Sequence, residues 1–514
     1  MERRTQVLRW TIFIILLAGW LYIAWNVPYT GDDWDWGLEE GLERWRSGEL
    51  NNRWMGTLFV LLMTRFPLVK TAVIGGSMVL IPLLLGLLAG RGRLEAGFPI
   101  VLVTAALILT TPMYSWQQTF GWVSAFANFV AAGVFLLLVL LLWQRTLSSS
   151  QNQQGTIGPA VLLFPLCLAT QLFAENLTLV LLCASVVCTV WSLHSGRGRL
   201  PALSSLAGCL LGAAFMFHNP LYGELLSSGQ AVNGIRNLIA APGDGLLPSA
   251  AVRFVTEVLP WLFENFPGAT ALVSAGCLWQ LVKRKAPWPV ISLAGLWMAY
   301  YCARNWLYLE QLRVWGEWTY GWPLLRFPEA LLQLGLLAGI LSTDKSTRRP
   351  ARLLLLLASV GLLLPFALIR DSGARCTFLA AVVLMVLGVS LLSDVPWNVW
   401  LLGAAGLGLA AGLLFHIQVY AAIGRSEAIR QAQMAQAVAQ GADSVVLPTE
   451  GWEYCYCWQR NPSAPRADYF RRFYGLPADM ELIFLPRGSS EQWPEVEPLL
   501  WAGAESFPPT DSSS

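Results

Sequence analysis

Long apolar runs separated by short polar segments dominate the chain, and this pattern predicts a series of membrane-spanning helices. A helix rises about 1.5 Å per residue, so about 20 apolar residues cross a hydrocarbon core of roughly 30 Å. We expect about thirteen spans, at residues 10–27, 68–90, 98–114, 122–143, 158–174, 176–193, 201–217, 266–282, 288–303, 322–341, 351–369, 376–393 and 397–416. The predicted fold class is mainly α, a polytopic membrane protein with about 11–13 transmembrane helices.

Two further apolar segments, 54–66 and 254–266, do not fit this series cleanly. Segment 54–66 is too short to cross a bilayer comfortably, and a span there would reverse the side of every later loop. We expect an interfacial or re-entrant helix at 54–66. Segment 254–266 carries the same ambiguity.

Lys and Arg residues of the short loops fall on one side when the spans are threaded in order. Cytoplasmic loops carry an excess of these residues, so we predict that this side, with the N-terminus, is cytoplasmic. It receives Arg3, Arg4, Arg9, Arg91, Arg93, Arg145, Arg197, Arg199, residues 283–285, Lys345, Arg348, Arg349 and Arg352. The longer segments 28–67, 218–265 and 304–321 then lie on the outer side, as does the C-terminal tail.

The chain divides into a polytopic membrane domain, 1–417, and a more polar tail, 418–514. Residues 425–440 are rich in Ala, Gln and Glu and predict a helix, and 444–448 and 481–485 predict short strands. We therefore expect a small α/β domain on the outer face, followed by a disordered end rich in Pro and Ser.

Composition agrees with this reading, because 55% of the residues are hydrophobic and only 13% are charged, against roughly 25% charged in soluble domains. The formal net charge of +2 gives no indication of a nucleic-acid partner.

Most of the nine cysteines lie in apolar stretches. Cys455 and Cys457 stand in the tail, but they supply too few ligands for structural zinc, so we predict no metal site.

An acidic motif follows the first predicted span. Asp32, Asp33 and Asp35 lie within four residues of one another, beside Trp34 and Trp36. Carboxylates this close raise each other's pKa unless a cation, donors or a proton are shared. The motif is either a solvated loop with interfacial tryptophans, or a catalytic site in which one carboxylate acts as general base.

Other polar residues are predicted on the same side of the membrane. Glu175 stands at the corner of a helical hairpin, where an ionisable residue in apolar sequence is a functional candidate. His218 begins the second long outer segment, and an interfacial role is the simpler reading for it. The outer arginines are Arg253, Arg304, Arg313, Arg370 and Arg375. A guanidinium grips phosphate oxygens at two points, although pairing with nearby acids would explain these residues equally well.

Several familiar catalytic signatures are missing from the sequence. It contains no Walker loop, no dinucleotide-binding glycine motif after a strand, no zinc-binding His-Glu-x-x-His and no nucleophile elbow. These absences argue against a nucleotide-driven pump.

An acidic pair after the first span, a polytopic body and an outer tail together resemble the GT-C superfamily of glycosyltransferases. More narrowly, the chain is similar to uncharacterised bacterial multipass membrane families related to that superfamily. The pieces that carry the resemblance are Gly31-Asp32-Asp33, residues 51–56 (Asn-Asn-Arg-Trp-Met-Gly), residues 121–128 (Gly-Trp-Val-Ser-Ala-Phe-Ala-Asn), Ala174-Glu175-Asn176, Ala241-Pro242-Gly243-Asp244 and Arg375.

The resemblance implies transfer of a sugar from a polyprenyl-phosphate donor to an outer acceptor, a surface glycan or lipid, in a bacterial inner (plasma) membrane. Asp32 or Asp33 would be the general base, with inversion at the sugar carbon. Arg375, with Arg370 or Arg253, would stabilise the departing lipid phosphate. The other implied substrate-binding residues are Asp35, Arg53, Trp122, Asn128, Glu175, Asn176 and His218, with Trp116 beside Trp122 as a stacking candidate. The resemblance requires no cofactor and leaves a divalent cation open.

Two other function classes stay open at this point. A transporter or flippase of lipid-linked saccharides would also need outer acids and arginines, although carriers more often place ionisable residues near mid-membrane or show internal repeats. A non-catalytic assembly or sensing protein would use the outer tail to bind a partner.

Overall fold

The structure is a computed structural model that describes residues 2–48, 52–148, 157–231, 236–240, 245–314, 323–370, 372–448 and 455–485. Helices account for most of these residues. The first half contains α1 (Glu2–Trp25), α2 (Asp33–Gly37), α3 (Glu39–Ser47), α4 (Trp54–Arg65), α5 (Pro67–Ala89), α6 (Leu94–Leu109), α7 (Met113–Gln117), α8 (Val123–Ala125), the π-helix η1 (Phe126–Val130), α9 (Ala131–Ser148), α10 (Ile157–Gln171), α11 (Glu175–Ser195), α12 (Arg199–Phe217) and α13 (Pro220–Ser228).

The second half begins with a short antiparallel pair, β1 (Gln230–Ala231) and β2 (Arg236–Asn237). The elements that follow are α14 (Leu246–Arg253), the π-helix η3 (Phe254–Val258), α15 (Leu259–Glu264), α16 (Pro267–Lys283), α17 (Trp288–Val314), α18 (Pro323–Ser342), α19 (Arg349–Gly361), the 3-10 helices η5 (Leu364–Ala367) and η6 (Ala374–Thr377), α20 (Phe378–Leu392), α21 (Val399–Gln440), β3 (Ser444–Pro448), the 3-10 helix η8 (Ala464–Arg466), α22 (Ala467–Tyr474) and β4 (Glu481–Leu485).

The predicted mainly α polytopic architecture is confirmed at the level of helix length and composition. Ten helices in the described part of the chain are long and apolar enough to cross a membrane. Three other apolar helices are shorter: Trp54–Arg65, Leu94–Leu109 and Ile157–Gln171. The predicted spans 98–114 and 158–174 correspond to α6 and α10, and both helices end earlier than predicted. Helix α6 ends before Thr110-Thr111-Pro112, and α10 ends at the corner that leads into α11. Segment 254–266 instead belongs largely to a longer candidate span, Leu246–Glu264.

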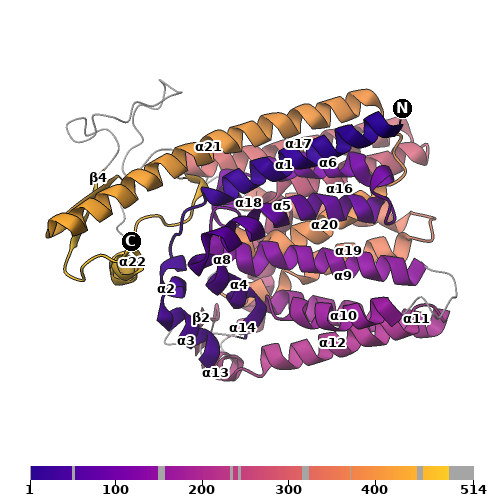
Figure 1. Cartoon of the computed structure of the whole chain (residues 1–514). Helices are drawn as coiled ribbons and strands as arrows, with labels where there is room; N and C mark the ends of the chain where they lie inside the picture. The colour runs from indigo at the N-terminus through magenta and orange to yellow at the C-terminus, as the bar shows by residue number, and fades with distance from the viewer. Residues whose placement is uncertain are drawn as a thin grey trace.

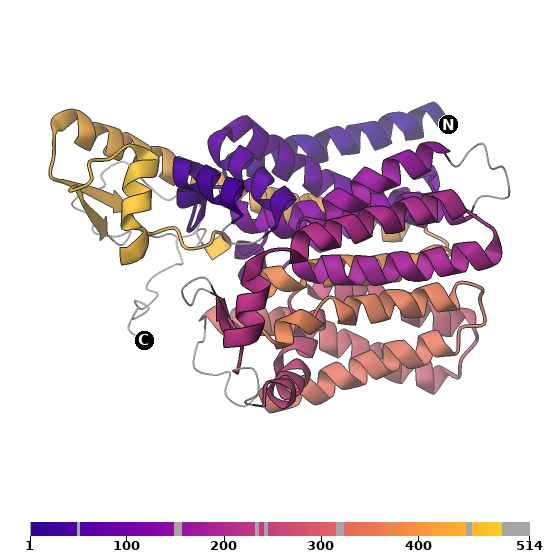
Figure 2. The same ribbon diagram turned by 90° about the horizontal axis from the view of Figure 1, so that it is seen from below.

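The long helices lie side by side in one bundle, with the N-terminus at one end (Figures 1 and 2). Helix α5 packs against α1, α6 and α9, and α16 packs along α20. Helix α4 has 12 residues, about 18 Å of rise, which is shorter than the hydrocarbon core. It packs against α5 and η1.

Helix α21 is continuous over 42 residues and projects beyond the bundle at the end opposite the N-terminus (Figure 1). The sequence predicted a span at 397–416 and a separate helix at 425–440. Both lie in α21, so the domain boundary placed between 417 and 418 falls inside one helix. No proline interrupts residues 399–440, and helix formers such as Ala, Gln and Glu continue after the apolar part ends.

Strands are present at both positions predicted in the tail, and β3 pairs with β4 in parallel. They pack with α22 and the end of α21 around Met434, Val445, Leu447 and Phe470. Trp34 of α2 is fully buried in this same cluster. The predicted disordered end, 486–514, lies outside the described residues.

Helices α5 and α6 cross at closely packed glycines. A Cβ added to Gly97 would overlap the backbone carbonyl oxygen of Gly86, and a Cβ on Gly86 would overlap the Val101 side chain. Small residues let helix backbones approach in this way.

We predict that Gly97→Ala lowers the thermal unfolding midpoint in detergent, because the two backbones must separate; overpacking of this kind costs about 1–3 kcal/mol. Gly76→Ala in α5 is the matched control, since a Cβ there meets nothing within 4 Å. Equal midpoints for the two variants would contradict the close crossing.

Candidate functional site

The acidic motif lies at the junction between the bundle and the C-terminal elements, where Figure 1 shows α2. Asp33 fixes the motif in place. Its Oδ1 accepts hydrogen bonds from the backbone N–H (2.8 Å) and the hydroxyl (2.5 Å) of Ser124, and its Oδ2 accepts one from the N–H of Thr30 (2.9 Å). Asp33 is fully buried. Burial and the charge of Asp32 raise the pKa of Asp33 to about 8, against the hydrogen bonds, which lower it.

Asp32 is in a different environment. It is half-buried, and its Oδ1 accepts a hydrogen bond of 2.8 Å from the indole Nε1 of Trp122. Burial and the charge of Asp35 raise the pKa of Asp32 to about 6, while Arg466, the Trp122 hydrogen bond and Arg375 lower it. A carboxylate with a pKa near 6 is largely ionised at neutral pH and can accept a proton.

Asp35 and Trp34 connect the motif to neighbouring elements. Asp35 Oδ2 accepts a hydrogen bond from Arg44 of α3 at 2.8 Å, and Arg44 in turn donates to the hydroxyl of Tyr469 in α22. Trp34 contacts the ring of Phe470 edge-on, with the ring centroids 5.1 Å apart. Asp35 is therefore linked to α22 through Arg44, and α22 lies close to the acidic motif.

Arg375 in η6 contacts the ring of Trp122, the residue whose indole donates to Asp32. Its guanidinium carbon lies 5.0 Å from the ring centroid of Trp122 and 6.0 Å from that of Trp458. The two indoles stack at 5.1 Å with an interplanar angle of 13°. Arg466 of η8 is the second cation near Asp32. Neither Arg375 nor Arg466 forms an ion pair with an acid in the described part of the chain.

Trp458 reaches the site because a backbone segment of the tail passes over two glycines. The N–H of Gly31 donates to the carbonyl of Gln459, and the N–H of Trp458 approaches the carbonyl of Gly121 at 3.4 Å. A Cβ on Gly121 would overlap the carbonyl oxygen of Tyr456. Gly31 has a φ of 61°, a conformation that suits glycine.

A second polar cluster forms around Glu175, at the start of α11. Two nitrogens of Arg53 make three hydrogen bonds to the Glu175 carboxylate. Nε donates to Oε2 at 2.9 Å and to Oε1 at 3.1 Å, and Nη2 donates to Oε2 at 2.5 Å. The Tyr222 hydroxyl donates to Glu175 Oε1 at 3.1 Å. Asn128, in η1, donates to the backbone carbonyl of Ser124. Ser124 thus contacts both Asp33 and Asn128.

Four other sequence candidates have no contact with Asp32 that the described residues show. Asn176 is buried and donates to the carbonyl of Leu362. Arg253 donates to the backbone carbonyls of Ile369 and Arg370 and pairs with Glu257, so its donors hold the loop before η6. Arg370 itself is exposed. His218 is also exposed, and it lines a separate cavity of about 510 Å³ beside Asn52 and Arg46.

Arg304 has the structural explanation that the sequence left open. It pairs with Glu264 at 2.8 Å and with Glu329 at 3.2 Å. Arg326 also pairs with Glu264. The side chain of Arg313 and the whole segment 241–244 lie outside the described residues.

Sequence reasoning missed several residues that the structure brings to the site. Trp458 and Arg466 come from the tail, where no motif identified them. Ser124 lies inside one of the motifs of the resemblance but was not singled out. Gln118 is buried, its Oε1 has no hydrogen-bond partner in the described part of the chain, and it faces Gly373 beside Arg375.

The described residues contain no group of three or more His, Cys, Asp and Glu side chains that could hold a metal ion. The carboxylates of the acidic motif have separate partners instead, Trp122 for Asp32, Ser124 for Asp33 and Arg44 for Asp35.

Comparisons of the chain with protein-family models, curated proteins and solved structures find no match. The functional argument therefore depends on the geometry of the site.

We expect Asp33→Ala to destabilise the protein more than Asp32→Ala. The first change leaves two backbone N–H groups and a hydroxyl without their acceptor, at about 1–3 kcal/mol for each buried group left unpaired, whereas Asp32 accepts a single side-chain hydrogen bond. Thermal unfolding of both variants in detergent measures the difference. A larger loss for Asp32→Ala would show that Asp33 does not fix the motif.

Proposed function

We propose that the chain is a membrane glycosyltransferase of GT-C type. It moves a sugar from a polyprenyl-phosphate donor to an acceptor on the outer surface, a cell-surface glycan or lipid. The observation that carries the proposal is the approach of a half-buried carboxylate, Asp32, to two guanidinium groups that lack acidic partners in the described part of the chain.

Asp32 is the general base in this mechanism. It takes the proton from the acceptor hydroxyl as that oxygen attacks the anomeric carbon, and the bond from the sugar to the lipid phosphate breaks on the opposite face. A single displacement of this kind inverts the anomeric centre. Asp33 is a positioning residue, because its oxygens already accept three hydrogen bonds.

Arg375 and Arg466 bind the departing lipid phosphate. Charge develops on its oxygens as the sugar leaves, and guanidinium groups with donors to spare stabilise that charge. The indole of Trp122 keeps Arg375 in place through a cation–π contact. The Arg53–Glu175 cluster and Asn128 supply polar groups for sugar hydroxyls.

The proposal includes a position in the cell. The site end of the bundle faces outward from a bacterial inner membrane, the N-terminus is cytoplasmic, and the elements after α21 form a small outer α/β domain. The excess of Lys and Arg in the loops at the other end supports this orientation.

Asp32→Asn should lower the rate of sugar transfer by about 10²–10⁴-fold, the usual contribution of a general base. The measurement uses membranes supplied with a panel of polyprenyl-phosphate hexoses, with protein amount and insertion checked for each variant. Glu224→Gln, an exposed acid of α13, is the matched control and should keep full activity. Arg375→Gln should also lose activity, with partial recovery in Arg375→Lys.

Full transfer by Asp32→Asn would remove the proposed base. If the wild-type protein moved lipid-linked sugar between the leaflets of vesicles without cleaving it, the chain would be a carrier instead.

The pH dependence of kcat/KM provides a second test. The base must be ionised, so activity should rise with pH, reach half of its limit near pH 6, the pKa of Asp32, and level off above it. Asp35→Asn removes a charge that raises the pKa of Asp32, so the acid limb should move to lower pH. Arg466→Gln removes a charge that lowers this pKa, and the limb should move to higher pH. Shifts in the same direction for both variants would contradict the assignment of Asp32 as the base.

A further inference from the structure

A second polar cavity, of about 620 Å³, lies at the far end of α20 from Arg375. Arg375 and Asp394 are separated along this helix by about 28 Å of rise, close to the thickness of the hydrocarbon core. The cavity is formed by the end of α16, the segment between α18 and α19, the first turn of α19 and Asp394, two residues after the end of α20. Its lining residues are Gln280, Lys283, Arg284, Thr343, Asp344, Lys345, Ser346, Thr347, Arg348, Arg352 and Asp394.

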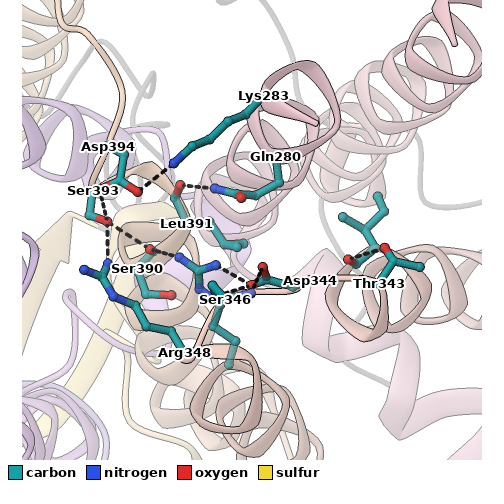
Figure 3. Close-up of polar contacts among 12 residues, drawn as sticks. Gln280, Lys283, Thr343, Asp344, Ser346, Arg348, Ser390, Leu391, Ser393 and Asp394 are labelled. Carbon is teal, nitrogen blue, oxygen red and sulfur yellow. Dashed lines mark hydrogen bonds and ion pairs between the residues drawn. The ribbon is translucent and has the colours of Figure 1, made fainter. Parts of the chain in front are cut away.

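The lining carries an excess of positive charge. Five cations, Lys283, Arg284, Lys345, Arg348 and Arg352, face only two carboxylates, Asp344 and Asp394. Lys283 pairs with Asp394 at 3.0 Å, and both side chains are about half exposed. Figure 3 shows this pair beside the contact between Arg348 and Ser393.

Asp344 organises the buried part of the cavity. Its two oxygens accept hydrogen bonds from the backbone N–H and the hydroxyl of Ser346, and Arg352 donates to it at 2.6 Å. Arg352 also donates to the carbonyl of Ser390, so it joins α19 to α20. Arg284 donates to the carbonyl of Ile340 and to Thr343. Arg284 and Arg352 are thus held by contacts among α16, α18, α19 and α20.

Several donors remain unused in this arrangement. Arg352 is 3% exposed, and its Nε has no hydrogen-bond partner among the residues that the structure describes. Arg284 Nη2 is also buried and has no hydrogen bond to any described residue, although it lies 3.4 Å from Asp344 Oδ1. Arg348 donates from Nη1 alone, to Ser393 at 3.0 Å, and Lys345 is exposed and has no acidic partner within the described residues. Buried polar donors are normally paired, so unpaired donors on side chains that line a cavity indicate a missing acceptor.

We propose that this cavity binds a phosphate group, either the headgroup of an anionic membrane lipid or free phosphate. A phosphate offers several oxygens with two charges or one, and it matches guanidinium forks better than a single carboxylate does. Basic pockets between helix ends at a membrane face are suited to lipid headgroups. The site is separate from the proposed transfer site and does not depend on that activity.

The test measures the thermal unfolding midpoint of the full chain in detergent. Phosphatidylglycerol in mixed micelles should raise the wild-type midpoint by about 2–4 °C, because a ligand that binds the folded state stabilises it, whereas phosphatidylcholine should not. The double variant Lys345→Gln, Arg348→Gln should lose most of this shift. The control Arg91→Gln, Arg93→Gln makes the same charge change in the loop between α5 and α6, outside the cavity, and should keep it.

A parallel arm compares inorganic phosphate with chloride at equal ionic strength. Stabilisation by phosphatidylglycerol alone assigns the site to a lipid headgroup, and stabilisation by inorganic phosphate that is lost in the Lys345, Arg348 double variant assigns it to free phosphate. The proposal is overturned if neither probe stabilises the wild-type chain. It is equally overturned if the control variant loses as much of the shift as the cavity variant, since that result reflects general attraction of basic loops.

Discussion

The candidate site depends on one interaction, the hydrogen bonds that the buried carboxyl group of Asp33 accepts from the backbone N–H and the hydroxyl of Ser124. Successive residues of a helix point about 100° apart. Once Asp33 faces the bundle, Asp32 is directed to Trp122, while Trp34 enters the core of the C-terminal elements. A single anchor therefore gives three adjacent residues three separate environments, which is why two neighbouring carboxylates differ in burial and in pKa.

The tail contributes the second half of the site. Its backbone can lie against the backbone of the bundle because the residues at the contact are glycines. Gly121 and Gly31 leave space for the segment that carries Trp458, whose indole covers that of Trp122. Arg375 lies against this pair without an acidic partner in the described part of the chain. Residues from the first loop, the α8 region, η6 and the tail meet around Asp32, so the site forms only when the bundle and the C-terminal elements are both folded.

Apolar spacing predicted most of the helices, because bilayer thickness sets their length, and two short apolar runs located the tail strands. Order along the chain and predicted side also selected Asp32, Trp122 and Arg375, which the structure brings together. Sequence could not distinguish Arg375 from Arg253, since Arg253 has, besides the nearby Glu257, backbone-carbonyl partners that are distant in the chain. The role of Trp458 in the site was not predicted, because no periodic pattern or motif surrounds this tryptophan in the polar tail. The junction inside α21 was missed because helix formers bridge the change from apolar to polar sequence.

The uninterrupted α21 has a mechanical consequence. Its 42 residues make a rod of about 63 Å, roughly twice the hydrocarbon thickness, and the same rod packs against α1 and α6 at one end and β3 at the other. Adding or deleting one residue would turn everything beyond that point by about 100°. The number of residues in α21 therefore sets the rotation of the C-terminal elements about the helix axis. That rotation decides whether Trp458 can stack on Trp122.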